Sequence, residues 1–451
     1  MGILSVYDLL LSPIYLLIIL LLAFYYQKSK QYKNKEYNYF TIGLIVKIIG
    51  ALALGLVYNF YYEGGDTINY FETAKSYGNF LGNNNEELIK TILGSTDVNY
   101  LRSSEAGYHL YIPRDYHAFF VVRLEIPIVL IGMLSYFPST IITAALCYTG
   151  TWKLFQVFYS VFPHLKKQLA IAILFIPSVT FWGSGIMKDS FTLAAVGWFT
   201  YAFYNFFILK KYSFIYFIHL FVASYIIIAI KPYIFFAILP GSIVWLSNDK
   251  LSEVKNKVLK FIFGPFVLGI GVVIGFLGLN AMGDYLGMYK IDTVLDRAVV
   301  VQKDMKADYY NGNSFDIGDF DASATGALSK APLAIFSGLF RPSILDVRNP
   351  MMLLSAFENT FFLFLTLFLL LKLRIRGFIA AIGSNPIVLF SILFSLFFTF
   401  SVGLSISNFG SLVRLRIPAI PFFMASLYIL KDVYNKKSIS VFKKPVVKNN
   451  K

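Results

Sequence analysis

Charge is scarce in this chain of 451 residues, because Asp, Glu, Lys and Arg make up only 14% of it and hydrophobic residues 57%. A soluble globular protein carries about 25% charged residues. The apolar residues come in near-continuous runs of about 20, long enough for transmembrane helices, rather than in the short alternating segments of a β-barrel. The sequence therefore predicts an all-α polytopic membrane protein.

Cysteine and the common catalytic motifs are also nearly absent. The single Cys147 excludes an intrachain disulfide and a thiolate metal cluster, and the four histidines lack the spacing of metal ligands. The chain has no Walker A loop, no GxSxG elbow and no HExxH motif. The first apolar run lacks a basic leader and a small-residue cleavage site, so we interpret it as a retained helix rather than a signal peptide.

About 11–12 transmembrane helices are predicted, all in one integral membrane domain over 1–430, followed by a basic cytoplasmic tail over 431–451. Two larger loops, about 62–116 and 282–350, are expected to carry amphipathic helices. The predicted spans cover 9–27, 39–61, 117–136, 138–161, 168–186, 190–209, 213–230, 232–247, 258–281, 351–372, 386–405 and 411–430.

The net charge of +15 is concentrated in short clusters at the ends of apolar runs, such as Lys28–Lys35 and the tail after Lys431. The positive-inside rule assigns these clusters to the cytoplasm, which puts both larger loops outside. Between the outside loop 62–116 and the inside Lys166 the chain must cross the membrane an odd number of times, yet two apolar runs lie there. We therefore predict that one of 117–136 and 138–161 is not a full crossing. Nucleic-acid binding would need a shared soluble surface, so no nucleic-acid partner is expected.

Several ionisable residues fall at the predicted outer face, where charges at membrane depth are costly and suggest function. Asp66, in the segment VYNFYYEGGDTINYF, stands where an amphipathic helix starts, and we expect it both to cap this helix and to work at a site, with capping alone as the alternative. Lys188 and Asp189 form a neutralised turn or meet a lipid phosphate. The other members of this set are Lys231, Arg341, Arg414 and Arg416.

Arginine at an outer helix start runs against the positive-inside bias. Its planar fork matches phosphate oxygens bidentately, although snorkelling to lipid headgroups is the ordinary alternative. Glu358 lies about two turns into an apolar segment and needs a partner there, for which one of the arginines is suitable.

A carboxylate after an early membrane helix, an amphipathic outer loop, many further spans and outer basic residues resemble the GT-C class of integral membrane glycosyltransferases. FWGSGIMKDS, SFDIGDFDAS with LFRPSILDVRNP, and SNFGSLVRLRIPAIPF also resemble segments of uncharacterised bacterial multispanning proteins grouped loosely with those enzymes. The resemblance implies a multi-pass protein of the bacterial cytoplasmic (inner) membrane with an extracytoplasmic active site. It would transfer a sugar from a polyprenyl-phosphate-linked donor to a glycan, lipid or protein acceptor in cell-surface glycan or glycolipid assembly.

By that resemblance Asp66 is the catalytic base, and Lys188, Arg341, Arg414 and Arg416 hold the donor phosphate. Asp189 orients Lys188 or contacts the sugar. The acid follows the second predicted helix instead of the first, and the GGD element lacks a second adjacent acid, so a metal requirement stays open. A divalent cation at Asp316 and Asp319 is the possible cofactor, and a solvated acidic loop is the alternative.

Three other functions remain open. A polysaccharide polymerase or ligase of the O-antigen type, acting on a polyprenyl-pyrophosphate-linked glycan, would also have a large outer loop and outer arginines. A transporter or flippase for lipid-linked glycans would place charges at the bilayer midplane, as Lys47, Arg123 and Glu125 within apolar runs allow. A structural membrane subunit is the third possibility.

Overall fold

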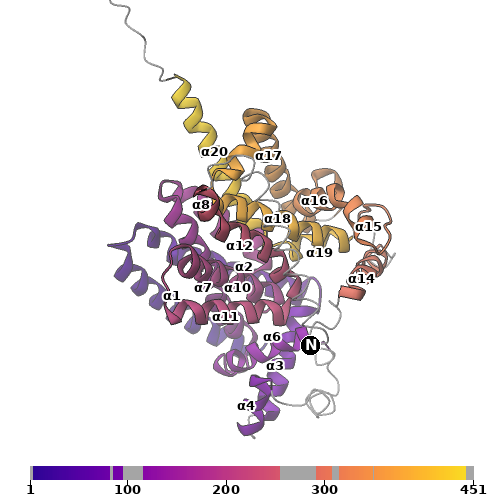
Figure 1. Cartoon of the computed structure of the whole chain (residues 1–451). Helices are drawn as coiled ribbons and strands as arrows, with labels where there is room; N and C mark the ends of the chain where they lie inside the picture. The colour runs from indigo at the N-terminus through magenta and orange to yellow at the C-terminus, as the bar shows by residue number, and fades with distance from the viewer. Residues whose placement is uncertain are drawn as a thin grey trace, which may run out of the picture. The chain divides into compact units, whose positions relative to one another are not determined.

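The computed structural model describes residues 4–81, 85–94, 115–253, 291–306, 314–348 and 350–442. Helices dominate these ranges, and an isolated antiparallel bridge pairs Ser314 with Asn408. The predicted class, an all-α polytopic membrane protein, is confirmed. The chain divides into two compact units, Met1–Phe235 and Phe236–Lys451, which are described separately (Figure 1). A single membrane domain over 1–430 stays a prediction.

The first unit contains the helices of the N-terminal half. They are α1 (Val6–Gln31), η1 (Lys35–Tyr39), α2 (Phe40–Phe60), α3 (Asp66–Leu81), α4 (Asn85–Leu93), α6 (Tyr116–Ile131), α7 (Tyr136–Val161), η3 (Pro163–Leu165), α8 (Lys166–Leu174), α9 (Pro177–Trp182), α10 (Lys188–Phe203), the π-helix η4 (Tyr204–Ile208), α11 (Phe214–Ile230) and the start of α12 (Pro232–Glu253).

The second unit contains the remaining helices. They are α14 (Ile291–Asp304), α15 (Ala324–Ser329), α16 (Ala331–Phe340), η7 (Ile344–Asp346), α17 (Pro350–Gly383), α18 (Pro386–Ser405), α19 (Phe409–Leu415) and α20 (Ile420–Phe442). Small residues bring α16 and α18 into close contact, since a Cβ at Gly403 would collide with the carbonyl oxygen of Ala334. Such small-residue contacts are typical of helix packing in membranes.

Within the described ranges, five helices are long and apolar enough to cross a membrane, or seven if each bent pair is one span. The number falls below the 11–12 predicted because several expected spans are short or broken. The expected span 168–186 is split into α8 and α9 before Pro177, and α11 has 17 residues. The expected span 258–281 lies outside the described residues.

The pair α6 and α7 bends by 116°, and α19 and α20 bend by 71°. At about 1.5 Å per residue, the 16 residues of α6 extend about 24 Å, less than the hydrocarbon thickness of about 30 Å. The prediction that one of the runs 117–136 and 138–161 is not a full crossing therefore agrees with the length and bend of α6. The expected single span 411–430 is instead the broken pair α19 and α20.

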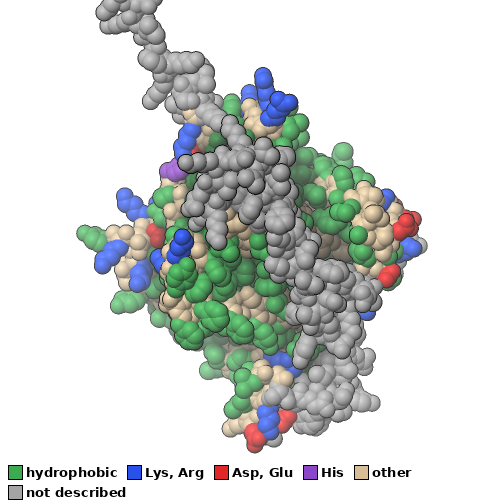
Figure 2. Space-filling model, in the orientation of Figure 1, with side chains coloured by type: hydrophobic (Ala, Val, Ile, Leu, Met, Phe, Trp, Pro, Cys, Tyr) green, Lys and Arg blue, Asp and Glu red, His purple; other side chains and the backbone are tan. Residues whose placement is uncertain are grey.

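Burial separates the helices of the first unit into central and peripheral ones. Only 6% of the most apolar stretch of α1 is buried, against 61% of the corresponding stretch within Lys188–Ile208. Hydrophobic side chains also cover the face of the unit where α11 is drawn (Figures 1 and 2). Exposed apolar helices of this kind are stable when lipid surrounds them.

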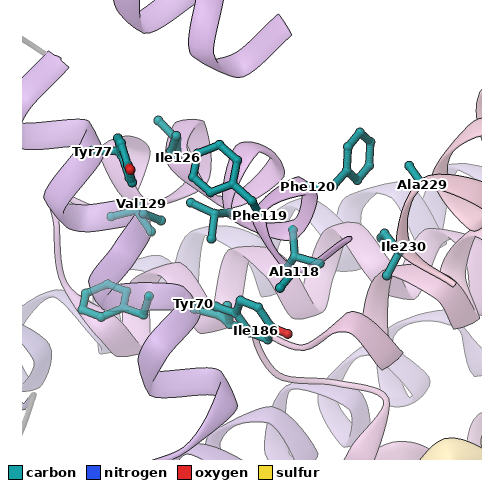
Figure 3. Packing of buried hydrophobic residues seen from close by; sticks show 14 of the residues in the cluster. Tyr70, Tyr77, Ala118, Phe119, Phe120, Ile126, Val129, Ile186, Ala229 and Ile230 are labelled. Carbon is teal, nitrogen blue, oxygen red and sulfur yellow. The ribbon is translucent and has the colours of Figure 1, made fainter. Parts of the chain in front are cut away.

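The core of the first unit joins α3 and α6 to the neighbouring helices (Figure 3). Aromatic residues from α3, including Tyr70 and Tyr77, pack against Phe119 of α6, and Tyr77 meets Phe119 edge to face with centroids 5.3 Å apart. Ile186 before α10 and Ile230 at the end of α11 belong to the same cluster. Apolar packing therefore fixes the place where α3, α6, α10 and α11 meet, and this place positions the site.

Candidate functional site at four helix starts

Asp66 is the first residue of α3, and a glycine turn sets its position. Gly65 has φ +114°, and its carbonyl accepts the first helical bond from the N–H of Asn69 at 2.9 Å. Gly65 therefore takes the N-cap position, and Asp66 follows at the first helical position, where a carboxylate is stabilised by the helix dipole. The side chain of Asp66 is half-buried.

Lys188, the first residue of α10, pairs with Asp115 just before α6. Its ammonium donates to Asp115 Oδ2 at 2.9 Å, and the two side chains are 18% and 27% exposed. Asp115 also accepts the N–H of His117 as the N-cap of α6. Burial alone would raise the pKa of Asp115, but Lys188 and the backbone N–H of Ala118 together hold that pKa below its ordinary value.

Asp189 and Lys231 form a second pair beside the first. Lys231 precedes α12 and donates to Asp189 Oδ1, and the two side chains are 0% and 5% exposed. Because burial removes both charges from water, such an ion pair is stable only when its hydrogen-bond geometry is good. Asp189 therefore forms an ion pair with Lys231, and Lys188 forms one with Asp115. The prediction that Asp189 orients Lys188 stays a prediction.

The two pairs and Asp66 lie at the same end of the first unit. Ile68 of α3 and Met187 before α10 pack in one hydrophobic cluster with Tyr58, which brings the starts of these two helices together. The starts of α3, α6, α10 and α12 therefore converge, and we call their charged residues the helix-start cluster. It consists of Asp66, Asp115, Lys188, Asp189 and Lys231.

Converging helix starts create a site suited to anions. Each helix start carries unsatisfied N–H groups and roughly half a positive charge from the helix dipole. The ammonium of Lys188 has three donors, of which Asp115 takes one, so it retains donors for a ligand oxygen. The cluster thus combines a region whose charges suit an anion with a half-buried carboxylate, Asp66.

An apolar cavity of about 240 Å³ lies along α10 beyond the cluster. It begins at Phe191, one turn after Lys188, and continues toward Trp198 between α7 and α11. Its remaining lining residues are Leu146, Cys147, Ala194, Ala195, His219, Val222, Ala223 and Ile226. A polar site at the helix starts is therefore followed by an apolar one between helices.

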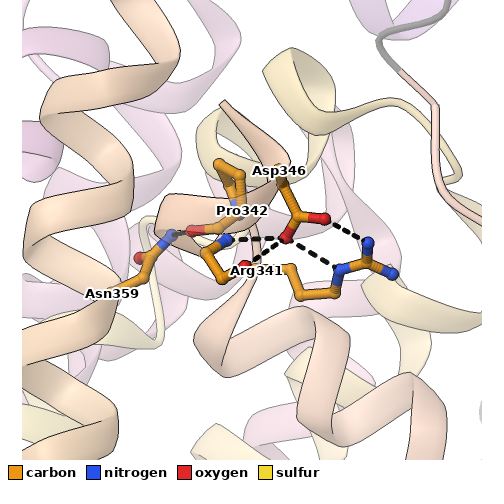
Figure 4. Close-up of polar contacts among 5 residues, drawn as sticks. Arg341, Pro342, Asp346 and Asn359 are labelled. Carbon is orange, nitrogen blue, oxygen red and sulfur yellow. Dashed lines mark hydrogen bonds and ion pairs between the residues drawn. The ribbon is translucent and has the colours of Figure 1, made fainter. Parts of the chain in front are cut away.

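In the second unit Arg341 forms an ion pair with Asp346, five residues further along the chain (Figure 4). Its Nη2 and Nε donate to Asp346 Oδ1 and Oδ2 at 2.5 Å and 3.2 Å. Burial raises the pKa of Asp346, but Arg341 and the N–H and hydroxyl of Ser343 outweigh it and lower that pKa. The guanidinium also lies 5.1 Å from the ring centroids of Phe315 and Phe409.

Arg416 is fully buried and anchors the same region. Its Nη1 donates to the carbonyls of Gly338 and Arg341 at 3.0 Å and 2.9 Å, and its Nη2 donates to Asn359 Oδ1. Asn359 in turn donates to the carbonyl of Pro342 at 2.8 Å (Figure 4). These bonds give Arg416 a structural role in holding α16, α17 and α19 together.

Glu358 and Arg414 are both half-buried. Glu358 lies within electrostatic range of Arg416, although Arg416 hydrogen-bonds the neighbouring Asn359. The predicted pairing of Glu358 with one of the arginines stays a prediction. That Arg341, Arg414 and Arg416 hold a donor phosphate stays a prediction.

The acidic loop gives no metal site among the described residues, where no group of three His, Cys, Asp or Glu side chains could hold an ion. Asp316 and Asp319 instead contact Lys306 at 2.6 Å and 3.7 Å. The hydrogen bond from Lys306 lowers the pKa of Asp316, with further help from the N–H of Gly318. A metal requirement stays open.

The charges inside apolar runs are buried among helices of the first unit. Lys47 donates to the carbonyl of Gly183, and Glu125 accepts from Thr143 at 2.9 Å and 3.1 Å. Arg123 lies over the rings of Tyr116 and Phe119. Each of these groups therefore contacts neutral groups, and a transport role stays a prediction.

Two partners were missed from the sequence, Asp115 and Asp346. Asp115 precedes an apolar run in the manner of an N-cap, a signal that was available for it. Comparison with known proteins adds no further constraint, since no family model, curated protein or solved structure matches the chain.

Proposed function

We propose that this protein is a membrane glycosyltransferase that uses a polyprenyl-phosphate-linked sugar donor at the outer face of the bacterial cytoplasmic membrane. The observation that carries the proposal is the helix-start cluster beside the apolar cavity along α10. A lipid-linked donor needs a phosphate site at headgroup level and a path for its tail between helices. Lys188 with the four helix starts supplies the first, and the cavity supplies the second.

In the proposed reaction, Asp66 accepts the proton of an acceptor hydroxyl as its oxygen bonds to the anomeric carbon of the sugar. The bond from that carbon to the phosphate oxygen breaks, and the lipid phosphate leaves with the electron pair. Lys188 and the N–H groups of the helix starts stabilise the negative charge that develops on it. Asp115 and the buried pair of Asp189 with Lys231 hold Lys188 and α10 in position.

The test replaces Asp66 by Asn and compares it with Glu72→Gln, a matched carboxylate-to-amide change at an exposed position on the same helix. General-base catalysis typically increases a reaction rate by about 10²–10⁴-fold. We therefore expect Asp66→Asn to lose sugar transfer by that factor and Glu72→Gln to keep it. The assay measures transfer from a polyprenyl-phosphate donor in lipid vesicles, after membrane insertion is confirmed.

Full transfer by Asp66→Asn would refute the base role. Extension of a polyprenyl-pyrophosphate-linked oligosaccharide by the unmodified protein, with single-sugar transfer never detected, would instead identify a polymerase. Lipid-linked glycan crossing the vesicle membrane without any transfer would identify a transporter.

A further inference from the structure

A second polar site lies at the opposite helix ends of the first unit. A cavity of about 670 Å³ opens where α1 ends, where α7 ends and where α10 passes into η4. Lys33 precedes α2, whereas Asp66 follows it. At about 1.5 Å per residue the 21 residues of α2 extend about 32 Å, close to the hydrocarbon thickness of about 30 Å. The cavity and the helix-start cluster therefore belong to opposite surfaces of a membrane.

The cavity is rich in positive charge and polar groups. Lys33, Lys35 and Lys211 line it, against a single acid, Glu36, which lies within electrostatic range of Lys166. Asn34, Gln156, Ser160 and Asn205 add neutral polar groups to the cavity lining. The charge balance favours an anionic ligand.

The three lysines are not neutralised by the protein. Within the described ranges neither Lys33 nor Lys35 forms an ion pair, and Lys211 donates to the neutral Asn205 Oδ1 at 3.3 Å. Asn205 is itself fixed, because its amide donates to the carbonyl of Tyr201 at 2.9 Å. The ammonium groups are thus exposed around a wall whose polar side chains are already positioned.

The π-helix η4 forms that wall. The N–H of Leu209 bonds the carbonyl of Tyr204 at 2.8 Å, and the N–H of Lys211 bonds that of Asn205 at 3.0 Å. Lys210 between them has φ +53°, which turns the chain so that Lys211 returns to the cavity. Single π-helical turns are frequent at functional sites.

Exposed apolar side chains lie at or close to the lining residues along the chain, and we call them the rim of the cavity. Tyr32 is 95% exposed, and Leu209, Tyr212 and Phe214 are also exposed. Such a rim is unfavourable in water but is typical of the membrane interface, where aromatic side chains sit at headgroup level. This rim favours a ligand that arrives from the lipid phase over one that arrives from water.

We propose that this cavity binds the phosphate headgroup of an anionic lipid in the leaflet opposite the helix-start cluster. The lysine ammoniums contact the phosphate, and the exposed rim contacts the start of the acyl chains. The site does not depend on the proposed glycosyltransferase activity. A water-soluble phosphate ester shares the headgroup chemistry, and the experiment distinguishes the two sources.

The experiment titrates the full chain in neutral detergent with phosphatidylglycerol, phosphatidylcholine or inorganic pyrophosphate and records the thermal unfolding temperature. A ligand that binds the folded state raises this temperature by mass action. Phosphatidylglycerol is expected to raise it and phosphatidylcholine to leave it unchanged. Each ammonium–phosphate contact that is lost is expected to lower the affinity about fivefold, so K33Q/K35Q/K211Q is expected to need on the order of a hundredfold more phosphatidylglycerol.

The matched control is K28Q/K30Q/K210Q, which removes three charges from the same basic segments without touching the cavity lining. It is expected to change the required concentration by only a few-fold. Ser160→Trp fills the cavity while keeping every lysine, and it is expected to weaken binding as well.

If both triple variants need the same increase in phosphatidylglycerol concentration, net charge alone attracts the lipid, and the proposed binding site is refuted. The same conclusion follows if neither phosphatidylglycerol nor pyrophosphate stabilises the unmodified protein. Stabilisation by pyrophosphate but not by phosphatidylglycerol would overturn the lipid source.

Discussion

The buried pair of Asp189 with Lys231 gives the sharpest prediction on stability. Its side chains are 0% and 5% exposed, so water cannot replace the ion pair when one of the two charges is removed. Removing one partner of a buried pair costs about 3–5 kcal/mol, whereas an exposed pair contributes about 0.2–1 kcal/mol. We therefore expect Asp189→Asn to lower the free energy of unfolding by about 3–5 kcal/mol. Asp115→Asn, whose pair is 27% and 18% exposed, should cost about 1 kcal/mol.

The assay is reversible unfolding in mixed detergent micelles, followed by circular dichroism. The double variant Asp189→Leu with Lys231→Met replaces the pair by apolar side chains of similar volume, which is often neutral. It should therefore be more stable than Asp189→Asn alone. A loss below about 1 kcal/mol in Asp189→Asn, or a double variant at least as unstable as the single one, would refute the burial argument.

Two further predictions concern the local geometry. Arg341 lowers the folded-state pKa of Asp346, so the pair stabilises the protein above the unfolded-state pKa of about 3.9, and this stability is lost as the pH falls through the folded-state pKa. Asp346→Asn should flatten the acid side of a plot of unfolding temperature against pH, and an unchanged slope would contradict it. Gly65→Ala should cost about 1–3 kcal/mol, since φ is +114° and the new Cβ would lie 2.8 Å from the ring of Tyr58. Gly383→Ala, in open space, is the control, and equal unfolding temperatures in the two variants would argue against strain.

The composition and the length of the apolar runs were enough to predict the class and most of the helix positions. The expected spans 39–61 and 386–405 correspond closely to α2 and α18. A long apolar run has few alternatives in lipid, because every backbone polar group must be bonded within the segment. The run 168–186 was harder to predict, since the break before Pro177 depends on packing as well as on the proline.

Among the site residues, the sequence predicted a helix start near Asp66 but wrongly made Asp66 its cap, a position that Gly65 takes in the structure. That Lys188 has a functional role stays a prediction. The sequence missed which carboxylate meets Lys188, because Asp189 is adjacent in the chain whereas Asp115 is 73 residues away. Lys188 and Asp189 are adjacent on α10 but have different partners. Lys188 pairs with Asp115, and Asp189 pairs with Lys231. The sequence likewise did not indicate that Asp346 is the partner of Arg341.

The sequence by itself determined that this protein is helical and crosses a membrane, since hydrophobicity and length are local properties of each segment. The tertiary structure decided which charged side chains form ion pairs within the protein. Burial and ion pairing depend on which helix ends meet, as at the helix-start cluster and around Arg416. These contacts between helix ends result from apolar packing between segments far apart in the chain, such as Ile68 with Met187. They cannot be predicted from any one segment alone.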